Sequence, residues 1–200
     1  MISVVIAEDQ AMVRDALAAL LTMSGKVEVL AKVENGRLAL AAVKELKPDV
    51  ILSDIEMPEM TGLELIQALL NEQSKTKAII VTTFARRGYL KRAMDLGVHG
   101  YLLKDSPSDS LITAIEKVVT GKRIIAPELV ADGWTANDPL TEKERLALRY
   151  VRDGMKTSDI AKIMHLTHGT VRNYLSNASS KLNAANSIDA ARIAHQSGWL

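Results

Sequence analysis

The chain has 200 residues, of which 48% are apolar and 24% charged, a composition that excludes intrinsic disorder, collagen-like repeats and an overall coiled coil. The formal net charge of +1 excludes a uniformly basic nucleic-acid-binding chain, and the lack of cysteine excludes disulfides, Cys-ligated zinc and thiol nucleophiles. Apolar runs are broken well before the ~18 residues that cross a bilayer, and residues 1–7 lack the basic lead of a signal peptide. We therefore expect a cytoplasmic protein.

Residues 1–120 alternate short β-branched runs with amphipathic segments of helical spacing. The runs predict strands at residues 2–7, 27–33, 50–53, 77–83 and 100–104, and the segments predict helices at 11–23, 36–46, 62–71, 88–96 and 107–120. Because strands and helices alternate, and stretches such as Ile79-Ile80-Val81 are apolar throughout, we predict a parallel sheet covered on both faces. Ser106 is the expected N-cap of the last of these helices, with Pro107 in its first turn.

Beyond residue 120 the alternation ends. Residues 121–138 combine two glycines, a proline and mixed polarity, which indicates a linker. Thr141 and Glu144 then form a capping-box pattern that opens a helix to about 153, and further helices are expected at 158–164, 168–182 and 188–196. We predict domains at 1–120 and 139–200, whose formal charges of −2 and +4 suggest a sensor joined to a nucleic-acid reader.

Polar side chains follow the ends of four predicted strands. Glu8 and Asp9 follow the first strand, Asp54 the third, Thr82 the fourth and Lys104 the fifth. Ligands of open parallel sheets bind beyond these strand ends, and three crowded carboxylates favour a hard divalent cation such as Mg²⁺. With Thr82 and Lys104 free to hold an anion, the group is typical of phosphoryl transfer. The plainer alternative for a single residue is a helix cap, as Asp9 could be for the helix at 11.

These residues resemble the receiver domain of bacterial response regulators. The matching stretches are Ala7-Glu8-Asp9, Asp54-Ile-Glu-Met-Pro58 with Gly62, Val81-Thr82-Thr83 and Gly100-Tyr101-Leu-Leu-Lys104. The resemblance implies a five-stranded, doubly wound, flavodoxin-like sheet in the order 2-1-3-4-5. Asp105 departs from the pattern, because many receivers carry proline after the lysine.

The receiver resemblance also implies roles for individual residues. Asp54 would accept a phosphoryl group from the phosphohistidine of a kinase, and Tyr101 would be the switch aromatic. Thr82 and Lys104 would contact the phosphoryl oxygens. The Mg²⁺ ligands would be Glu8, Asp9, Asp54 and the backbone carbonyl of Glu56. A haloacid-dehalogenase-type phosphatase is the enzymatic alternative, but its motif needs a second Asp where Glu56 stands. We therefore expect no enzyme.

The helical region carries a helix-turn-helix pattern. Residues 158–164, a turn at His165-Leu166, and residues 168–182 fit two helices, of which the second would enter the major groove. The N-terminus of this second helix offers backbone amides and hydroxyls, which suit phosphate. Arg and Asn side chains suit guanine and adenine in the major groove. The expected DNA contacts are Thr167, His168, Thr170, Arg172, Asn173, Ser176 and Lys181. The alternative from spacing alone is a plain helix bundle with one polar face.

Residues 139–200 resemble the LuxR-type output domain, so the whole chain is similar to the NarL/FixJ family of response regulators. The matching residues include Leu140-Thr-Glu-Lys-Glu144, Ile160-Ala161 and Gly169-Thr-Val-Arg-Asn-Tyr174. The output domain departs from the family at Ala178, Ser179, Ser180 and Ser187, where larger or charged residues are usual. These losses of volume and charge predict weaker packing and either modest DNA affinity or DNA binding that depends strongly on dimerisation.

The family resemblance implies a two-component transcription regulator. Further stretches, among them Thr82-Thr-Phe-Ala-Arg86 and Lys104-Asp-Ser-Pro-Ser108, resemble regulators of membrane-lipid desaturation in bacilli. A DesK-like membrane sensor histidine kinase would then be the phosphate donor, double-stranded promoter DNA the target, and a phosphorylated homodimer the active state. The alternative is a phosphorylation-controlled protein-interaction regulator with impaired DNA binding.

Overall fold

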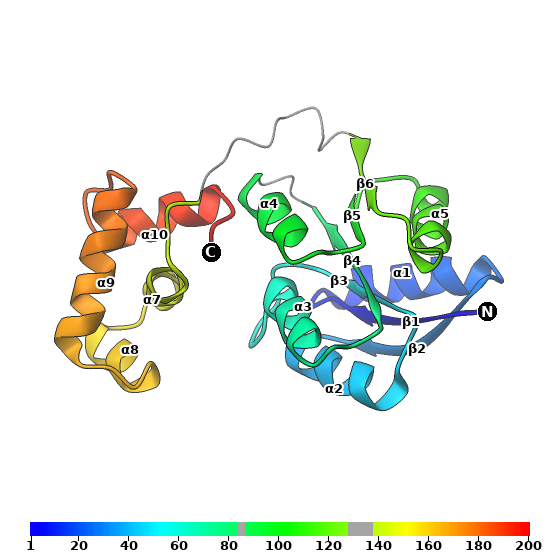
Figure 1. The fold of residues 1–200 in the computed structure, drawn as a ribbon, viewed down its shortest axis with the longest axis horizontal. Coiled ribbons are helices and arrows are strands. Elements are labelled where there is room, and N and C mark those ends of the chain that lie inside the picture. The colour runs from blue at the N-terminus through cyan, green and yellow to red at the C-terminus, as the bar shows by residue number, and fades with distance from the viewer. Residues whose placement is uncertain (84–86, 128–137) are drawn as a thin grey trace. The chain divides into compact units, whose positions relative to one another are not determined.

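A computed structural model describes residues 1–83, 87–127 and 138–200, and these form two compact units, the first made mainly of residues before 127 and the second mainly of residues after 138. Figure 1 gives the element labels used below. Most of the predicted linker, residues 128–137, lies outside the described residues. None of the helices that the structure describes has the length and hydropathy needed to span a lipid bilayer.

The N-terminal unit is built on a parallel sheet. Its strands are β1 (Ile2–Ala7), β2 (Val27–Val33), β3 (Val50–Ser53), β4 (Lys77–Thr82), β5 (Gly100–Leu103) and β6 (Ile124–Ile125). Their order, β2-β1-β3-β4-β5-β6, confirms the predicted arrangement of the first five strands and adds a sixth beside β5. The sequence did not indicate β6, because two consecutive isoleucines are too short a run to show a strand period.

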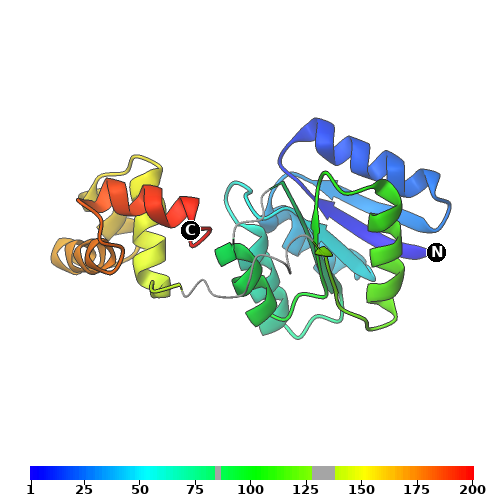
Figure 2. The ribbon, with the colours of Figure 1, turned by 90° about the horizontal axis from the view of Figure 1, so that it is seen from above.

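Helices cover both faces of the sheet, as predicted. They are α1 (Ala11–Met23), α2 (Gly36–Leu46), α3 (Gly62–Asn71), α4 (Arg87–Asp95) and α5 (Ser108–Val119). Figure 2 shows α1 and α5 on one face and α2, α3 and α4 on the other. Residues 4–7, 50–53 and 78–82 of the central strands are buried between these layers, and their apolar side chains form the centre of the core. This core positions every strand end of the N-terminal unit.

The start of α5 differs from the prediction. Pro107, not Ser106, occupies the N-cap position, with extended backbone (φ −53°, ψ 140°) and no side-chain cap. The Pro107 carbonyl instead accepts a hydrogen bond from Ser110 N at 2.9 Å. Proline fits this position because its φ is already fixed near the required value and the N–H it lacks has no helical partner there.

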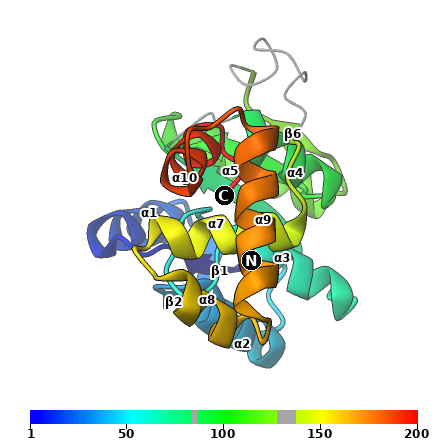
Figure 3. The same cartoon turned by 90° about the vertical axis from the view of Figure 1, so that its left-hand side faces the viewer.

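The C-terminal unit consists of four helices, α7 (Glu142–Arg152), α8 (Thr157–Ile163), α9 (His168–Lys181) and α10 (Ser187–Gln196). The predicted capping box is present, since the Thr141 side chain accepts from Glu144 N while Glu144 accepts from Thr141 N. Figure 3 shows α9 crossing α7, with α8 near the start of α9 and α10 near its end. Leu148, Ile160 and Val171 are fully buried among these helices. The expected helix-turn-helix pair therefore corresponds to α8 and α9.

Candidate functional site

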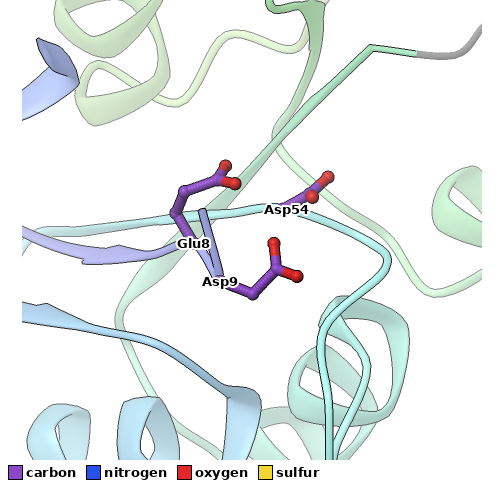
Figure 4. Close-up of side chains that lie close together, drawn as sticks. All are labelled: Glu8, Asp9 and Asp54. Atoms are coloured by element: carbon purple, nitrogen blue, oxygen red, sulfur yellow. The ribbon is translucent and has the colours of Figure 1, made fainter. Parts of the chain in front are cut away.

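Three carboxylates meet at the carboxyl edge of the parallel sheet. Glu8 and Asp9 follow β1, and Asp54 follows β3. β1 and β3 are neighbours with Ala7 opposite Ser53, so the residues after them lie side by side. Each carboxylate offers an oxygen within 4.8 Å of the oxygens of the other two, and Figure 4 shows the three side chains converging. The structure thus brings together the acidic residues that the sequence indicated.

Lys104 supplies the positive charge of this cluster. Its Nζ lies 2.7 Å from Glu8 Oε2 and 3.0 Å from Asp54 Oδ2. The three side chains are 8%, 1% and 9% exposed, so these ion pairs are screened little by water. With Asp9 included, three carboxylates and one ammonium leave two formal negative charges, which one divalent cation matches.

Burial controls the ionisation of this cluster. Desolvation raises the pKa of Glu8 above its ordinary value, although the hydrogen bond from Lys104 opposes the shift. Desolvation likewise raises the pKa of Asp54, and the charge of Asp9 adds to the effect. For Lys104, burial acts to lower the pKa, but the hydrogen bond with Glu8 and the charge of Asp54 outweigh it and the pKa is raised. The ammonium therefore stays charged, and a second cation would favour both ionised carboxylates.

The turn from β3 to α3 fixes the orientation of Asp54. Asp54 N donates to Ala7 O at 2.9 Å, and Ile55 N donates to Asp54 Oδ1 at 2.7 Å, which leaves Oδ2 for Lys104. At the start of α3, a Cβ on Gly62 would lie only 2.0 Å from Asp54 O. Only glycine permits this approach, so Gly62 sets how closely α3 packs behind the carboxylate.

The remaining predicted residues of this unit occupy distinct positions. Asp9 is exposed and does not cap α1, because Gln10 is the N-cap and makes no side-chain cap bond. Thr82 is 4% exposed at the end of β4, and its carbonyl accepts from Lys104 N at 2.8 Å. Tyr101 is fully buried on β5, and Glu56 is half-buried in the turn after Asp54. Thr82 and Lys104 thus lie together, whereas Tyr101 lies in the core.

The exposed face of α9 carries most of the predicted DNA contacts. His168, Arg172, Asn173 and Ser176 are all exposed, whereas Val171, Leu175 and Ala178 point into the core. Thr167 is the N-cap, and its Oγ1 accepts from Thr170 N at 3.1 Å. The helical period therefore separates an exposed polar face from a buried apolar face.

Lys181 differs from the other predicted contacts. Its Nζ lies 2.7 Å from Oε2 of Glu144, which is 3% exposed at the start of α7. The structure thus gives this ammonium a partner inside its own domain, and its contact with a DNA phosphate stays a prediction. Burial acts to raise the pKa of Glu144, but the Lys181 hydrogen bond and the Thr141 N–H outweigh it, and the pKa is lowered.

The small residues late in α9 and at the start of α10 differ in their burial. Ala178 is fully buried, and Ser179 Oγ donates to Leu175 O at 2.8 Å, which satisfies its hydroxyl within the helix. Ser180 is exposed, and Ser187 is the half-buried first residue of α10. The effect of these four residues on DNA affinity stays a prediction.

Two arginines were not singled out from the sequence. Arg145 is 4% exposed and forms ion pairs with Asp138 and Glu142, and its Nε donates to Trp199 O at 2.5 Å. It thereby joins the first and last described parts of the C-terminal unit. Arg14 Nη1 donates to Glu8 O at 2.6 Å, behind the acidic cluster. The sequence carries no periodic signal for such side-chain contacts to backbone carbonyls.

Comparison with known proteins agrees with both units. Residues 4–116 match the response regulator receiver domain family, and residues 138–194 match the luxR family of bacterial regulatory proteins. The transcriptional regulatory protein DesR of Bacillus subtilis is 47% identical over 100% of this chain and 99% of its own. The uncharacterized transcriptional regulatory protein YvfU of the same organism is 46% identical over 100% of both chains.

A solved structure agrees with the fold over part of the chain. A LuxR-family DNA-binding response regulator from Staphylococcus aureus is 41% identical, covers 60% of this chain and 99% of its own, and has a TM-score of 0.58. The relatives are transcriptional regulators rather than enzymes, in agreement with the sequence prediction. With a receiver domain followed by a LuxR-type DNA-binding domain, the chain belongs to the NarL/FixJ family of two-component response regulators that control transcription.

Proposed function

We propose that Asp54 accepts a phosphoryl group from a histidine kinase and that this modification controls DNA binding by α9. The observation that carries the proposal is the buried Asp54 carboxylate, held between two further carboxylates and Lys104. In the transfer, the bond between phosphorus and the histidine nitrogen breaks and a bond from an Asp54 carboxylate oxygen forms. The imidazole leaves and takes up a proton.

Mg²⁺ suits this cluster, because the donors are all oxygens and the cluster carries two uncompensated negative charges. Glu8, Asp9, Asp54 and the backbone carbonyl of Glu56 would hold the ion. When bound, it would offset the charge that the phosphoryl group brings. A receiver that binds Mg²⁺ should therefore accept phosphate only when these carboxylates are ionised.

Lys104 and Thr82 are the groups that would respond to the new phosphoryl oxygens. A phosphorylated side chain carries about −1.5 to −2 charge, more than the carboxylate it replaces. Lys104 already contacts Asp54 at 3.0 Å, so it needs little movement to reach the phosphoryl group. We propose that the Thr82 hydroxyl also contacts the phosphoryl oxygens and that Tyr101 repacks. These movements would favour a homodimer or release of the output domain.

For DNA reading, we propose that Arg172 and Asn173 contact base edges, while Thr167, His168, Thr170 and Ser176 contact the backbone. The exposed side chains of Arg172 and Asn173 near the start of α9 support this division. Lys181 is better explained by its pairing with Glu144. We further propose a receiver domain at 1–120, an output domain at 139–200 and a linker at 121–138, the first part of which extends the receiver sheet as β6.

The phosphate donor that we propose is a membrane sensor histidine kinase of the DesK type, with membrane-lipid genes as targets in a cytoplasmic setting. The support is the 47% identity to DesR, although the 46% identity to YvfU is almost as high. Pathway assignment therefore depends on a direct test of kinase pairing. Phosphotransfer to this chain should be measured with the purified histidine kinase that pairs with DesR and, separately, with the one that pairs with YvfU.

The central experiment measures phosphorylation by acetyl phosphate with intact-mass spectrometry. We expect a phosphoryl adduct on the wild-type chain with Mg²⁺, and none with EDTA or with Asp54→Asn. A normal adduct on Asp54→Asn would refute the site assignment. Light scattering with beryllofluoride then tests dimerisation, since a ligand shifts an equilibrium only if it binds one state better. Gel shifts on genomic fragments, with and without phosphorylation, test DNA binding; no shift in either state would favour the protein-interaction alternative.

A further inference from the structure

The turn between β1 and α1 carries Asp9 into the acidic cluster. The Arg14 side chain donates hydrogen bonds to the backbone of this turn. Arg14, in the first turns of α1, places Nη1 2.6 Å from Glu8 O and 3.4 Å from Asp9 O. Arg14 N also donates to Gln10 O at 2.9 Å, which anchors the residue to the same turn. Both carbonyls of the acidic pair therefore face one guanidinium.

In the described part of the chain, the other contacts of this turn hold the neighbours of Asp9 rather than Asp9 itself. Glu8 N donates to Val33 O at 3.0 Å, and Gln10 N reaches Glu8 Oε1 at 3.3 Å, so the residues on either side of Asp9 are tied down. The Asp9 side chain is exposed, and Gln10 makes no side-chain cap bond that would stiffen the start of α1. Within the described part of the chain, Arg14 is the side chain that donates to the Asp9 carbonyl.

The charge of Arg14 makes its placement informative. A guanidinium close to a cation site repels the cation, and the N-terminus of α1 adds positive potential of the same sign. By charge alone, removing Arg14 should strengthen cation binding. By positioning, removing it should free the turn, let Asp9 sample other orientations and weaken cation binding. Loss of the charge and loss of the positioning contact change cation affinity in opposite directions, so measuring that affinity in an Arg14 variant separates them.

We propose that Arg14 is a positioning residue for the cation site, because it fixes the Glu8 and Asp9 carbonyls so that the Asp9 carboxylate points toward Asp54. The inference rests on the proposed function, in which Asp9 binds the cation directly. Removing residues that orient metal ligands commonly costs about 10–100-fold in affinity. We expect a loss near the lower limit, about tenfold, because Arg14 acts on the backbone of the ligand.

The test uses the full chain and Mn²⁺ as a spectroscopic probe, with free Mn²⁺ counted by electron paramagnetic resonance. Arg14→Met removes the donor and the charge while keeping the length of the side chain. The matched control is Lys32→Met, which removes a cation paired with Asp15 at the same end of the sheet, opposite Ile6. We expect weaker Mn²⁺ binding in Arg14→Met, by about tenfold, and unchanged or tighter binding in Lys32→Met.

A second variant and a metal-free readout keep the proposal testable if Arg14→Met folds poorly. Arg14→Lys keeps the charge and can reach one carbonyl, so we expect an affinity between those of the wild type and Arg14→Met. In the metal-free protein, the Gln10 amide should exchange faster in Arg14→Met, because its bond to Glu8 depends on the fixed turn.

The possible outcomes separate the inference from the proposed function. Unchanged or tighter Mn²⁺ binding in both Arg14 variants would overturn the positioning role while leaving the site intact. If the wild type binds no Mn²⁺, or if Asp9→Asn and Asp54→Asn bind it as tightly as the wild type, the proposed cation site itself fails. Weaker binding in Arg14→Met with an unchanged melting temperature supports the positioning role.

Discussion

Replacing Lys181 with methionine tests whether this residue serves the fold or the DNA. In the structure, its ammonium pairs with Glu144, whose carboxylate is buried and also accepts the Thr141 N–H at 2.8 Å. Lys181→Met keeps the aliphatic stem but leaves the Glu144 charge without its cation. The variant should therefore destabilise the C-terminal unit, because an unpaired buried carboxylate has lost water without gaining a partner.

The size of the effect follows from the exposure of the two partners. Breaking a fully buried ion pair costs about 3–5 kcal/mol, whereas exposed pairs contribute about 0–1 kcal/mol. The Glu144 side chain is 4% exposed and that of Lys181 is 36% exposed, so we expect an intermediate loss. We estimate a decrease of about 1–3 kcal/mol in the free energy of unfolding. Adding Glu144→Gln should recover part of this loss, because a neutral amide needs no counter-charge.

The assay is urea unfolding of the full chain, followed by the fluorescence of Trp199 in a Trp134→Phe background. The folded pKa of Glu144 is lowered, so the ion pair contributes its full stability above the ordinary glutamate pKa of about 4.3 and loses it as pH falls through the lowered value. The difference between wild type and Lys181→Met should accordingly be present at pH 7 and vanish in acid.

Two results would refute this reasoning. One is a Lys181→Met chain as stable as the wild type at pH 7. The other is a DNA-binding salt slope that falls by about one while stability is unchanged, as expected if Lys181 neutralises a phosphate.

Three further predictions concern the two sites. Gly62→Ala should destabilise the receiver by about 1–3 kcal/mol or more in urea unfolding, since its Cβ would collide with Asp54 O; an unchanged midpoint would contradict this. Because burial raises the pKa of Asp54, phosphorylation by acetyl phosphate should decline as the pH falls, with a midpoint above pH ~3.9. Lys104→Met should move that midpoint higher, because it removes the ammonium that favours the ionised carboxylate. A midpoint below pH ~3.9 would argue against the effect of burial. Arg172→Ala should cost about 1–3 kcal/mol at one base position in gel shifts, and an equal loss on all sequences would assign Arg172 to phosphate instead.

Much of the N-terminal fold could be predicted because its signals are local. The bounds of α1, α2 and α3 follow directly from apolar periodicity and flanking turn residues. The acidic cluster was predictable for a related reason: carboxyl ends of neighbouring parallel strands meet at one edge, so Glu8 and Asp54 had to approach each other.

What could not be predicted depends on individual side-chain contacts rather than on local periodicity. The pairing of Lys181 with Glu144 joins residues 37 positions apart, and it arises only from the way α9 crosses α7. The reach of Arg14 to the Glu8 carbonyl depends on side-chain rotamers rather than on sequence period. Residue type alone indicates a solvated cation in both cases.

The short strand β6 bears on how the receiver should be isolated. Ile124 N donates to His99 O and Ala126 N donates to Tyr101 O, so β6 covers the backbone of β5 that would otherwise be open. A fragment that ends at residue 120 would expose this edge, and bare edges recruit strands from other molecules. Such a fragment should self-associate for reasons unrelated to signalling, whereas one that ends at residue 127 keeps the edge protected. Receiver fragments of this chain should therefore include β6 before any mass change is interpreted as regulation.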